Sequence, residues 1–159
     1  METSVATAHC KHIAGKKLAI VPILRAGLGM VDGMVTMMPN VKVGHIGLFR
    51  DPQTLEPVKY YFKMPPDIAE RDVIIVDPML ATGGSMELSY QAMLTKGHPS
   101  EIHVASIIAS QRAVDHIASI LPEDKTTIWC AAIDPEINEH SYIVPGLGDA
   151  GDLAFGEKE

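Results

Sequence analysis

Residues 73–85 hold the feature that most constrains the fold: an apolar strand that runs into a glycine turn and then into a helix. Val73–Val76 is a compact β-branched run, and Asp77 follows it directly. After the turn, apolar side chains take the spacing of one helix face, at Met86, Tyr90, Met93 and Leu94. A turn through Gly83 and Gly84 places the free N–H groups of a helix N-terminus around Thr82–Ser85, where an anion can bind.

The rest of the chain repeats this alternation of strands and helices. Further strands are predicted at the apolar runs 18–24, 41–49, 102–109 and 127–133, and a second helix at 113–121. Such alternation favours an α/β fold with a mostly parallel central β-sheet flanked by helices. Residues 1–16 lack a sustained apolar period and predict an irregular N-terminal tail. We therefore expect one domain over residues 17–159, in which the glycine-rich segment 146–156 is a loop.

The charge and the cysteine count argue against several classes of protein. With a formal net charge of -7, the chain has no general electrostatic attraction for nucleic acid, so an anionic substrate needs a local cluster of donors. Two separated cysteines, Cys10 and Cys130, cannot build a disulfide framework. No apolar run approaches the roughly 20 residues that span a bilayer, and the N-terminus does not resemble a secretory signal. We expect a cytoplasmic protein with no nucleic-acid partner, no membrane partner and no built metal site.

The turn after Val76 has the chemistry of a sugar-phosphate site. Gly83 and Gly84 lack the Cβ atoms that would keep a phosphate away, while Thr82 and Ser85 add hydroxyl donors. Asp77 is placed to accept hydrogen bonds from sugar hydroxyls. The segment is neither a Walker loop, since no Lys follows the glycines, nor a GxGxxG fingerprint. The alternative is a structural glycine turn capped by a serine, but the preceding strand and the following amphipathic helix favour the phosphate site.

Three segments, in this order along the chain, resemble the uracil phosphoribosyltransferases, a branch of the type I phosphoribosyltransferase fold. Residues 77–85 (DPMLATGGS) resemble their segment for 5-phosphoribosyl 1-diphosphate (PRPP), including Pro78 and Ala81 where the wider superfamily has acids. Residues 21–30 (VPILRAGLGM) resemble the diphosphate loop, and residues 138–152 resemble the uracil-binding end. Leu55–Pro57 and Tyr60 fall in a region similar to the family's extended β-arm. Family members usually carry a further N-terminal helical segment, so this chain resembles a truncated member.

The resemblance implies an enzyme that joins uracil to PRPP and releases UMP and diphosphate, with Mg²⁺ arriving as Mg-PRPP. Its catalytic residues are expected to be Arg25, Arg50 and Asp77. The expected PRPP contacts are Arg25, Arg50, Asp77, Pro78, Met79, Leu80, Ala81, Thr82, Gly83, Gly84, Ser85 and Asp149. The expected uracil contacts are Ile143, Gly148, Asp149 and Ala150. The resemblance also implies a homo-oligomer, a dimer or larger, and GTP as a possible effector. No residue is a convincing general base.

Each of these interpretations has an alternative that the residues leave open. Arg25 interrupts an apolar passage and needs an anionic partner, which is either a ligand diphosphate or an internal carboxylate. Arg50 in isolation is typical of a solvated strand end, and the acidic glycine-rich stretch 146–152 of a surface turn. At the level of function, the first alternative is a catalytically impaired regulator that binds PRPP or UMP. The second is an RNA-binding attenuation protein, which the acidic balance disfavours.

Overall fold

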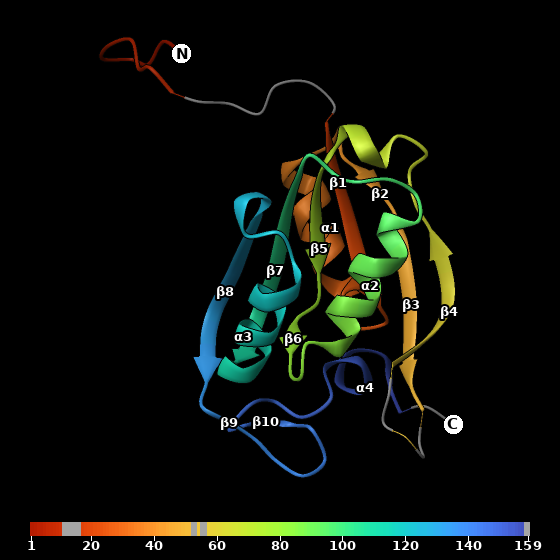
Figure 1. Cartoon of the computed structure of the whole chain (residues 1–159). Helices are drawn as coiled ribbons and strands as arrows, with labels where there is room; N and C mark the ends of the chain where they lie inside the picture. The colour runs from red at the N-terminus through yellow and green to blue at the C-terminus, as the bar shows by residue number, and fades with distance from the viewer. Residues whose placement is uncertain (11–16, 52–53, 55–56, 158–159) are drawn as a thin grey trace.

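The computed structural model describes residues 1–10, 17–51, 54 and 57–157, and its centre is one twisted β-sheet (Figure 1). Its strands are β1 (Leu18–Leu24), β2 (Lys42–Val43), β3 (His45–Arg50), β4 (Pro57–Lys63), β5 (Asp72–Val76), β6 (Met79–Leu80), β7 (Glu101–Ser110) and β8 (Thr126–Asp134). The path through the sheet is β4-β3-β1-β5-β7-β6, with β2 beside β1 and β8 beside β7. Every pairing in it is parallel except that of β3 with β4. The predicted α/β fold with a mostly parallel sheet is confirmed.

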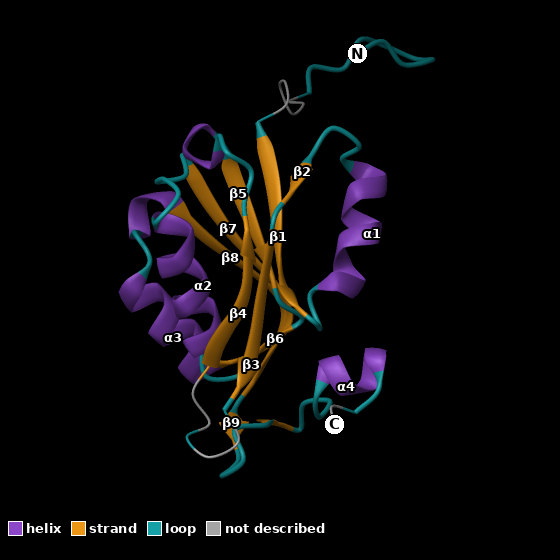
Figure 2. Ribbon diagram, turned by 90° about the vertical axis from the view of Figure 1, so that its right-hand side faces the viewer, coloured by secondary structure: helices purple, strands orange, loops and turns teal. Residues whose placement is uncertain are grey.

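Helices cover both faces of the sheet. They are α1 (Leu28–Met37), α2 (Gly84–Leu94), α3 (Gln111–Ile120) and α4 (Ala150–Phe155), with short 3₁₀ turns η1 (Ile68–Glu70) and η2 (Glu123–Lys125). Figure 2 shows α2 and α3 on one face, and α1 and α4 on the other. A small hairpin of β9 (Glu136–Ile137) and β10 (Ile143–Val144) lies below the sheet in Figure 1. In the described ranges, no helix has the length and apolar character to cross a bilayer.

The side chains of β5 explain why both faces need cover. Val73 and Ile75 point into the main core under α2 and α3, while Val76 packs with Ile20 and Val31 under α1. All five are at most 6% exposed. A parallel strand that is apolar on both sides in this way becomes the centre of a three-layer structure. The main core is completed from the helices by Met86, Met93, Ala113 and Ile117.

Most of the predicted elements have their predicted boundaries within two residues. The strands expected at 18–24, 102–109 and 127–133 are β1, β7 and β8, and the helix expected at 113–121 is α3. The strand expected at 41–49 is divided into β2 and β3 at Gly44, whose N–H donates to the carbonyl of Ile20. Of the expected tail, residues 1–10 are exposed, and the remaining positions, 11–16, lie outside the described residues.

Several elements were not predicted from the sequence, among them α4 and β4 at the cleft end of the sheet. The segment 146–156 is wrong as a continuous loop, because it contains α4. Asp149 caps this six-residue helix by accepting a hydrogen bond of 2.9 Å from the backbone N–H of Asp152. The polar stretch after Arg50 contains β4, whose side chains are mostly exposed. A helix of this length shows no apolar period, and an exposed strand shows no alternation, so neither carries the usual local signal.

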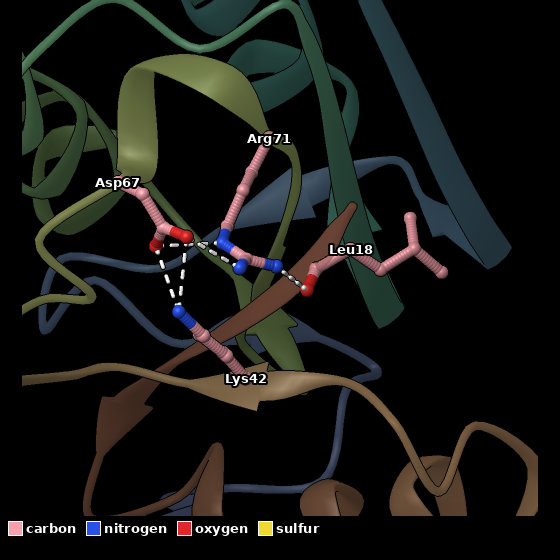
Figure 3. Close-up of polar contacts among 4 residues, drawn as sticks. All are labelled: Leu18, Lys42, Asp67 and Arg71. Carbon is pink, nitrogen blue, oxygen red and sulfur yellow. Dashed lines mark hydrogen bonds and ion pairs between the residues drawn. The ribbon is translucent and has the colours of Figure 1, made fainter. Parts of the chain in front are cut away.

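An ion cluster of four residues joins three segments at the amino ends of the central strands (Figure 3). The guanidinium of Arg71, only 5% exposed, donates to both carboxylate oxygens of Asp67 at 2.8 and 2.6 Å, and to the carbonyl of Leu18 at 3.1 Å. Lys42 donates to the same carboxylate at 2.9 and 3.1 Å. Hydrogen bonds from Arg71 and then Lys42 hold the pKa of Asp67 well below its ordinary value, and the same carboxylate raises the pKa of Arg71. The cluster therefore ties β1, β2 and the start of β5 together.

Candidate active site

A cleft of about 480 Å³ opens at the carboxyl ends of β1 and β5. Figure 1 shows α4 at the same end of the sheet. Its walls come from the turn after β1, the β3–β4 pair, the turn after β5, and the segment from His140 to Gly151. In open parallel sheets, ligands bind in crevices at this end of the strands, because the loops that follow the strands gather there. The cleft is therefore the candidate active site.

The turn after β5 has the backbone that the glycines predicted. Gly83 has φ +87°, a left-handed conformation, and α2 begins at the next residue. A Cβ on Gly83 would also lie 2.8 Å from the ring of His116, so two independent constraints require glycine here. Gly84 is different: a Cβ there would meet nothing closer than 3.7 Å. Packing within the chain therefore explains Gly83 and leaves Gly84 without a steric role.

Four of the nine residues predicted to contact PRPP in this turn line the cleft: Asp77, Met79, Ala81 and Ser85. The other five do not line it: Pro78, Leu80, Thr82, Gly83 and Gly84. Leu80 is 2% exposed and belongs to the main core, so its side chain is structural. The hydroxyl of Thr82 lies 3.5 Å from the backbone nitrogen of Gly84, at the start of α2.

Arg25 lines the same cleft from the turn after β1, and its preceding peptide bond is cis. One guanidinium nitrogen donates to a carboxylate oxygen of Asp152 at 2.5 Å, and another donates to the carbonyl of Gly156 at 3.0 Å. Its Nε is buried and has no hydrogen-bond partner among the described residues. The internal ion pair, one of the two partners expected for Arg25, is thus present, while a role in diphosphate binding stays a prediction.

The C-terminal segment contributes three of the four predicted uracil contacts to the cleft. Gly148, Asp149 and Ala150 line it, and Gly148 has φ +81°. Ile143 does not line it: the residue is 2% exposed and sits in β10. Any contact of Ile143 with a ligand would therefore use its main chain or require a different position of β10. Among the described residues, nothing lies within 4 Å of the position that a Cβ on Gly148 would occupy, so the space beside this backbone is open.

The predicted second arginine cannot be placed in the site. Arg50 ends β3, and its side chain lies outside the described part of the chain. Leu55 and Glu56 of the expected arm also lie outside the described residues. The arm itself continues as β4, which begins at Pro57 and brings Tyr60 to the cleft.

Several cleft residues were not assigned as site residues from the sequence. Phe49 and Tyr60 line one wall, with ring centroids 6.3 Å apart and planes tilted by 43°. His140 and Tyr142 line the wall formed by the C-terminal segment. Only the antiparallel register of β3 and β4 brings Tyr60 near Phe49, and that register has no local signal in the sequence. Aromatic faces in a cleft are suited to contact with a planar base.

The charges in the cleft suit an anionic ligand that carries a metal ion. Arg25 supplies a cation, while Asp77 and Asp149 place two carboxylates in the same cavity. In the ranges that the structure describes, no three or more His, Cys, Asp or Glu side chains come together as a metal cage. Mg²⁺ is commonly held by one or two carboxylates together with phosphate oxygens of the substrate, and this donor set fits that mode.

Comparison with known proteins gives one consistent result. The model of the family described as "Uracil phosphoribosyltransferase" matches residues 1–157. The uracil phosphoribosyltransferases of Clostridioides difficile and Exiguobacterium sibiricum are 53% and 57% identical over 158 residues, with 99% of this chain and 74% of each relative covered. Among solved structures, the AQ2163 protein from Aquifex aeolicus matches with a TM-score of 0.85 and 33% identity, covering 98% of this chain and 73% of that one. A purine phosphoribosyltransferase from Pyrococcus horikoshii, at 20% identity and a TM-score of 0.55 over 77% and 80% of the two chains, shares the fold.

Proposed function

Because this chain belongs to the uracil phosphoribosyltransferase family, we propose that its cleft binds uracil and PRPP together and converts them to UMP and diphosphate. The chain is accordingly a transferase of the glycosyltransferase class, in pyrimidine salvage. The observation that carries the proposal is that Arg25, Asp77, Ser85 and Asp149 line one cleft although they come from three separate segments. A structural glycine turn alone does not require a cation and two carboxylates around the same cavity.

The reaction exchanges one bond at the anomeric carbon of PRPP for another. The bond from this carbon to the diphosphate oxygen breaks, the bond to uracil N1 forms, and the N1 proton is released. Departure of diphosphate leaves oxocarbenium character on the ribose, as in other glycosyl transfers. The protein therefore has to hold base, sugar and leaving group in line and to stabilise the departing negative charge.

We assign the phosphoribosyl part of PRPP to the turn after β5. Its 5′-phosphate is bound by Ala81–Ser85, where the first N–H groups of α2 are available and the helix dipole favours an anion. Asp77 accepts from the ribose hydroxyls. The diphosphate is bound by Arg25 and Arg50, whose planar guanidinium groups suit bidentate contact with phosphate.

Uracil is assigned to the part of the cleft that the C-terminal segment lines. The base is neutral, planar and lined with alternating carbonyl acceptors and N–H donors, so main-chain groups can recognise its edge. Gly148–Ala150 lines the cleft and offers such groups, and Gly148 itself is exposed. Ile143 adds a main-chain contact. The rings of Phe49 and Tyr60 support this assignment, because they offer apolar surface within the same cavity.

Mg²⁺ enters this scheme as part of the substrate. The ion neutralises charge on the diphosphate when it is bound, and Asp77 and Asp149 are the residues that would hold it. No protein group is assigned as the base for N1. We propose that its proton is lost late, to diphosphate or to water.

The oligomeric state, the effector and the cellular location of this protein stay predictions. We expect a homo-oligomer, GTP as an effector and a cytoplasmic location, on the strength of the resemblance described above. Light scattering at several protein concentrations tests the first, and the dependence of UMP formation on GTP concentration tests the second. A monomer at micromolar concentration would contradict the predicted oligomer. A rate of UMP formation that does not change with GTP would contradict the predicted effector.

The main proposal is tested by incubating the protein with uracil, Mg²⁺ and PRPP and measuring the formation of UMP. UMP formation is expected, and binding of PRPP without turnover would instead favour the regulator. The variant Arg25→Ala should lose PRPP use far more than it loses folding, because the guanidinium is assigned to the leaving group. Equal loss of activity and of thermal stability would undo that assignment.

A further inference from the structure

Two buried serines of β7 hold the backbone of the turn that we assign to the phosphate. Ser106 donates to the carbonyl of Asp77 at 2.7 Å, and Ser110 donates to the carbonyl of Ala81 at 2.6 Å. They are 8% and 1% exposed, so water does not compete for these hydrogen bonds. The contacts bind the two ends of residues 77–81 to the neighbouring strand, and neither serine lines the cleft.

Ser110 makes the more specific of the two contacts. The hydroxyl of Ser106 is shared, since the carbonyl of Ile108 lies 3.0 Å from it as well. Among the described residues, the hydroxyl of Ser110 donates only to the carbonyl of Ala81, and it accepts a hydrogen bond of 3.0 Å from the N–H of Ala113. Ser110 is therefore the N-cap of α3 and, with the same oxygen, the support of the turn.

The hydrogen bond from Ser110 determines the orientation of the peptide group between Ala81 and Thr82. The carbonyl and the N–H of a trans peptide point in opposite directions. A carbonyl held by Ser110 therefore directs the N–H of Thr82 away from β7 and α3. Ala81, which supplies the carbonyl of this peptide group, and Ser85, further along the turn, both line the cleft.

A second contact from α3 keeps the same turn in place. The ring of His116 lies against Gly83, 2.8 Å from the position that a Cβ would occupy. Its Nε2 lies 2.8 Å from a carboxylate oxygen of Glu87, in the first turn of α2. Ser110 thus holds the turn at Ala81, and His116 of α3 packs against it at Gly83 and contacts Glu87 of α2, which leaves the backbone of the turn few alternative conformations.

We propose that Ser110 is a positioning residue for PRPP: through its hydrogen bond to the Ala81 carbonyl it presets the N–H donors of the turn for the 5′-phosphate. The proposal rests on the proposed function, because it takes the 5′-phosphate to bind at Ala81–Ser85. A preorganised set of donors binds an anion more tightly than one that has to be ordered during binding. Loss of the Ser110 hydroxyl should therefore weaken PRPP binding while leaving uracil recognition intact.

Three substitutions at this position separate support of the turn from capping of the helix. Ser110→Ala removes both functions. Ser110→Gly removes the hydroxyl but keeps a residue that is well tolerated at an N-cap. Ser110→Thr keeps the hydroxyl. Ser89→Ala is the matched control, since Ser89 is a buried serine of α2 whose hydroxyl has no hydrogen-bond partner among the described residues.

The measurements are KM for each substrate, kcat, affinity for Mg-PRPP by calorimetry, and the thermal midpoint. We expect the Ala and Gly variants to raise KM and Kd for PRPP by about fivefold to tenfold, as for one lost buried hydrogen bond, with KM for uracil unchanged. The Gly variant should do so with the smaller loss of thermal stability. The Thr variant should restore PRPP affinity, and Ser89→Ala should match the parent chain.

Other outcomes overturn the proposal. If PRPP affinity follows the thermal midpoint across the variants, or if the Ala and Gly variants retain parental PRPP affinity, Ser110 is only a helix cap. The parent chain is measured first, so failure of the proposed function is recognised separately. If the parent binds Mg-PRPP without forming UMP, the proposed reaction fails while the variants still test Ser110 by calorimetry. If the parent does not bind Mg-PRPP, both proposals fall.

Discussion

The guanidinium of Arg25 lies 2.5 Å from a carboxylate oxygen of Asp152, so the cation that we assign to diphosphate is already paired within the chain. Asp152 belongs to α4, and the carbonyl of Gly156 accepts a second hydrogen bond from Arg25. The two side chains are 30% and 32% exposed. Diphosphate therefore has to compete with Asp152 for this guanidinium. Because Asp152 belongs to α4, the outcome of this competition changes a contact of that helix.

The variant Asp152→Asn should bind PRPP more tightly than the parent chain. It removes the competing charge while keeping the backbone N–H that Asp149 caps. Because partly exposed ion pairs contribute little, we expect KM for PRPP to fall by only about twofold to fivefold. Glu157→Gln, which makes the same change of charge at an exposed position nearby, is the control. A rise in KM with Asp152→Asn would mean that this carboxylate contributes directly to substrate binding.

The variant Gly83→Ala should destabilise the fold. A left-handed backbone and a Cβ 2.8 Å from His116 both oppose the added methyl group. We expect the free energy of unfolding to fall by about 1–2 kcal/mol, measured by urea denaturation, from the backbone alone. Unchanged stability would show that the turn can relax around alanine.

The variant Gly84→Ala should affect PRPP binding rather than stability. The added Cβ meets nothing closer than 3.7 Å and occupies the first turn of a helix, so stability should be unchanged or slightly higher. If a phosphate approaches this backbone closely, KM for PRPP should nevertheless rise by about tenfold, as for loss of a charge-assisted contact. A Gly84→Ala variant with parental KM for PRPP would remove Gly84 from the phosphate site.

Asp67 should make folding stability depend on pH in the acidic range. Arg71 and Lys42 hold its folded pKa below the ordinary value of 3.8, so the unfolded chain takes up this proton first as pH falls. The stabilisation is thus present above the ordinary value and is lost as pH drops below it. Asp67→Asn should lower the thermal midpoint at about pH 7 and do so less at about pH 3. Asp124→Asn, an exposed carboxylate in η2, is the control; an equal effect at both pH values would contradict the pairing.

His140 tests the proposal that no protein base removes the N1 proton. The imidazole lines the cleft and is 73% exposed, so it is the side chain best placed to contradict that proposal. We expect His140→Ala to keep the pH profile of kcat and to stay within about threefold of the parent in kcat, below the usual effect of a general base. Loss of one ionisation limb together with a fall in kcat of about a hundredfold or more would identify His140 as the base.

Local sequence patterns predicted much of the framework but only part of the cleft. β1, β7 and α3 were expected from apolar runs and helical spacing, which depend on neighbours a few residues away. The glycine turn before α2 was expected for the same reason. By contrast, the side chains of β4 are mostly exposed, and its formation depends on pairing with β3. Tyr60 reaches the cleft only through that pairing.

The sequence by itself determined the parallel sheet and the turn at Asp77–Ser85, because apolar period, glycine position and helix start are properties of adjacent residues. Only the tertiary structure decided which partner Arg25 takes, since Asp152 is distant in sequence and reaches it through the placement of α4. The same holds for Ser110, which meets Ala81 because β6 and β7 lie side by side in one particular register. Register and the packing of layers depend on the whole chain, and no local pattern records them.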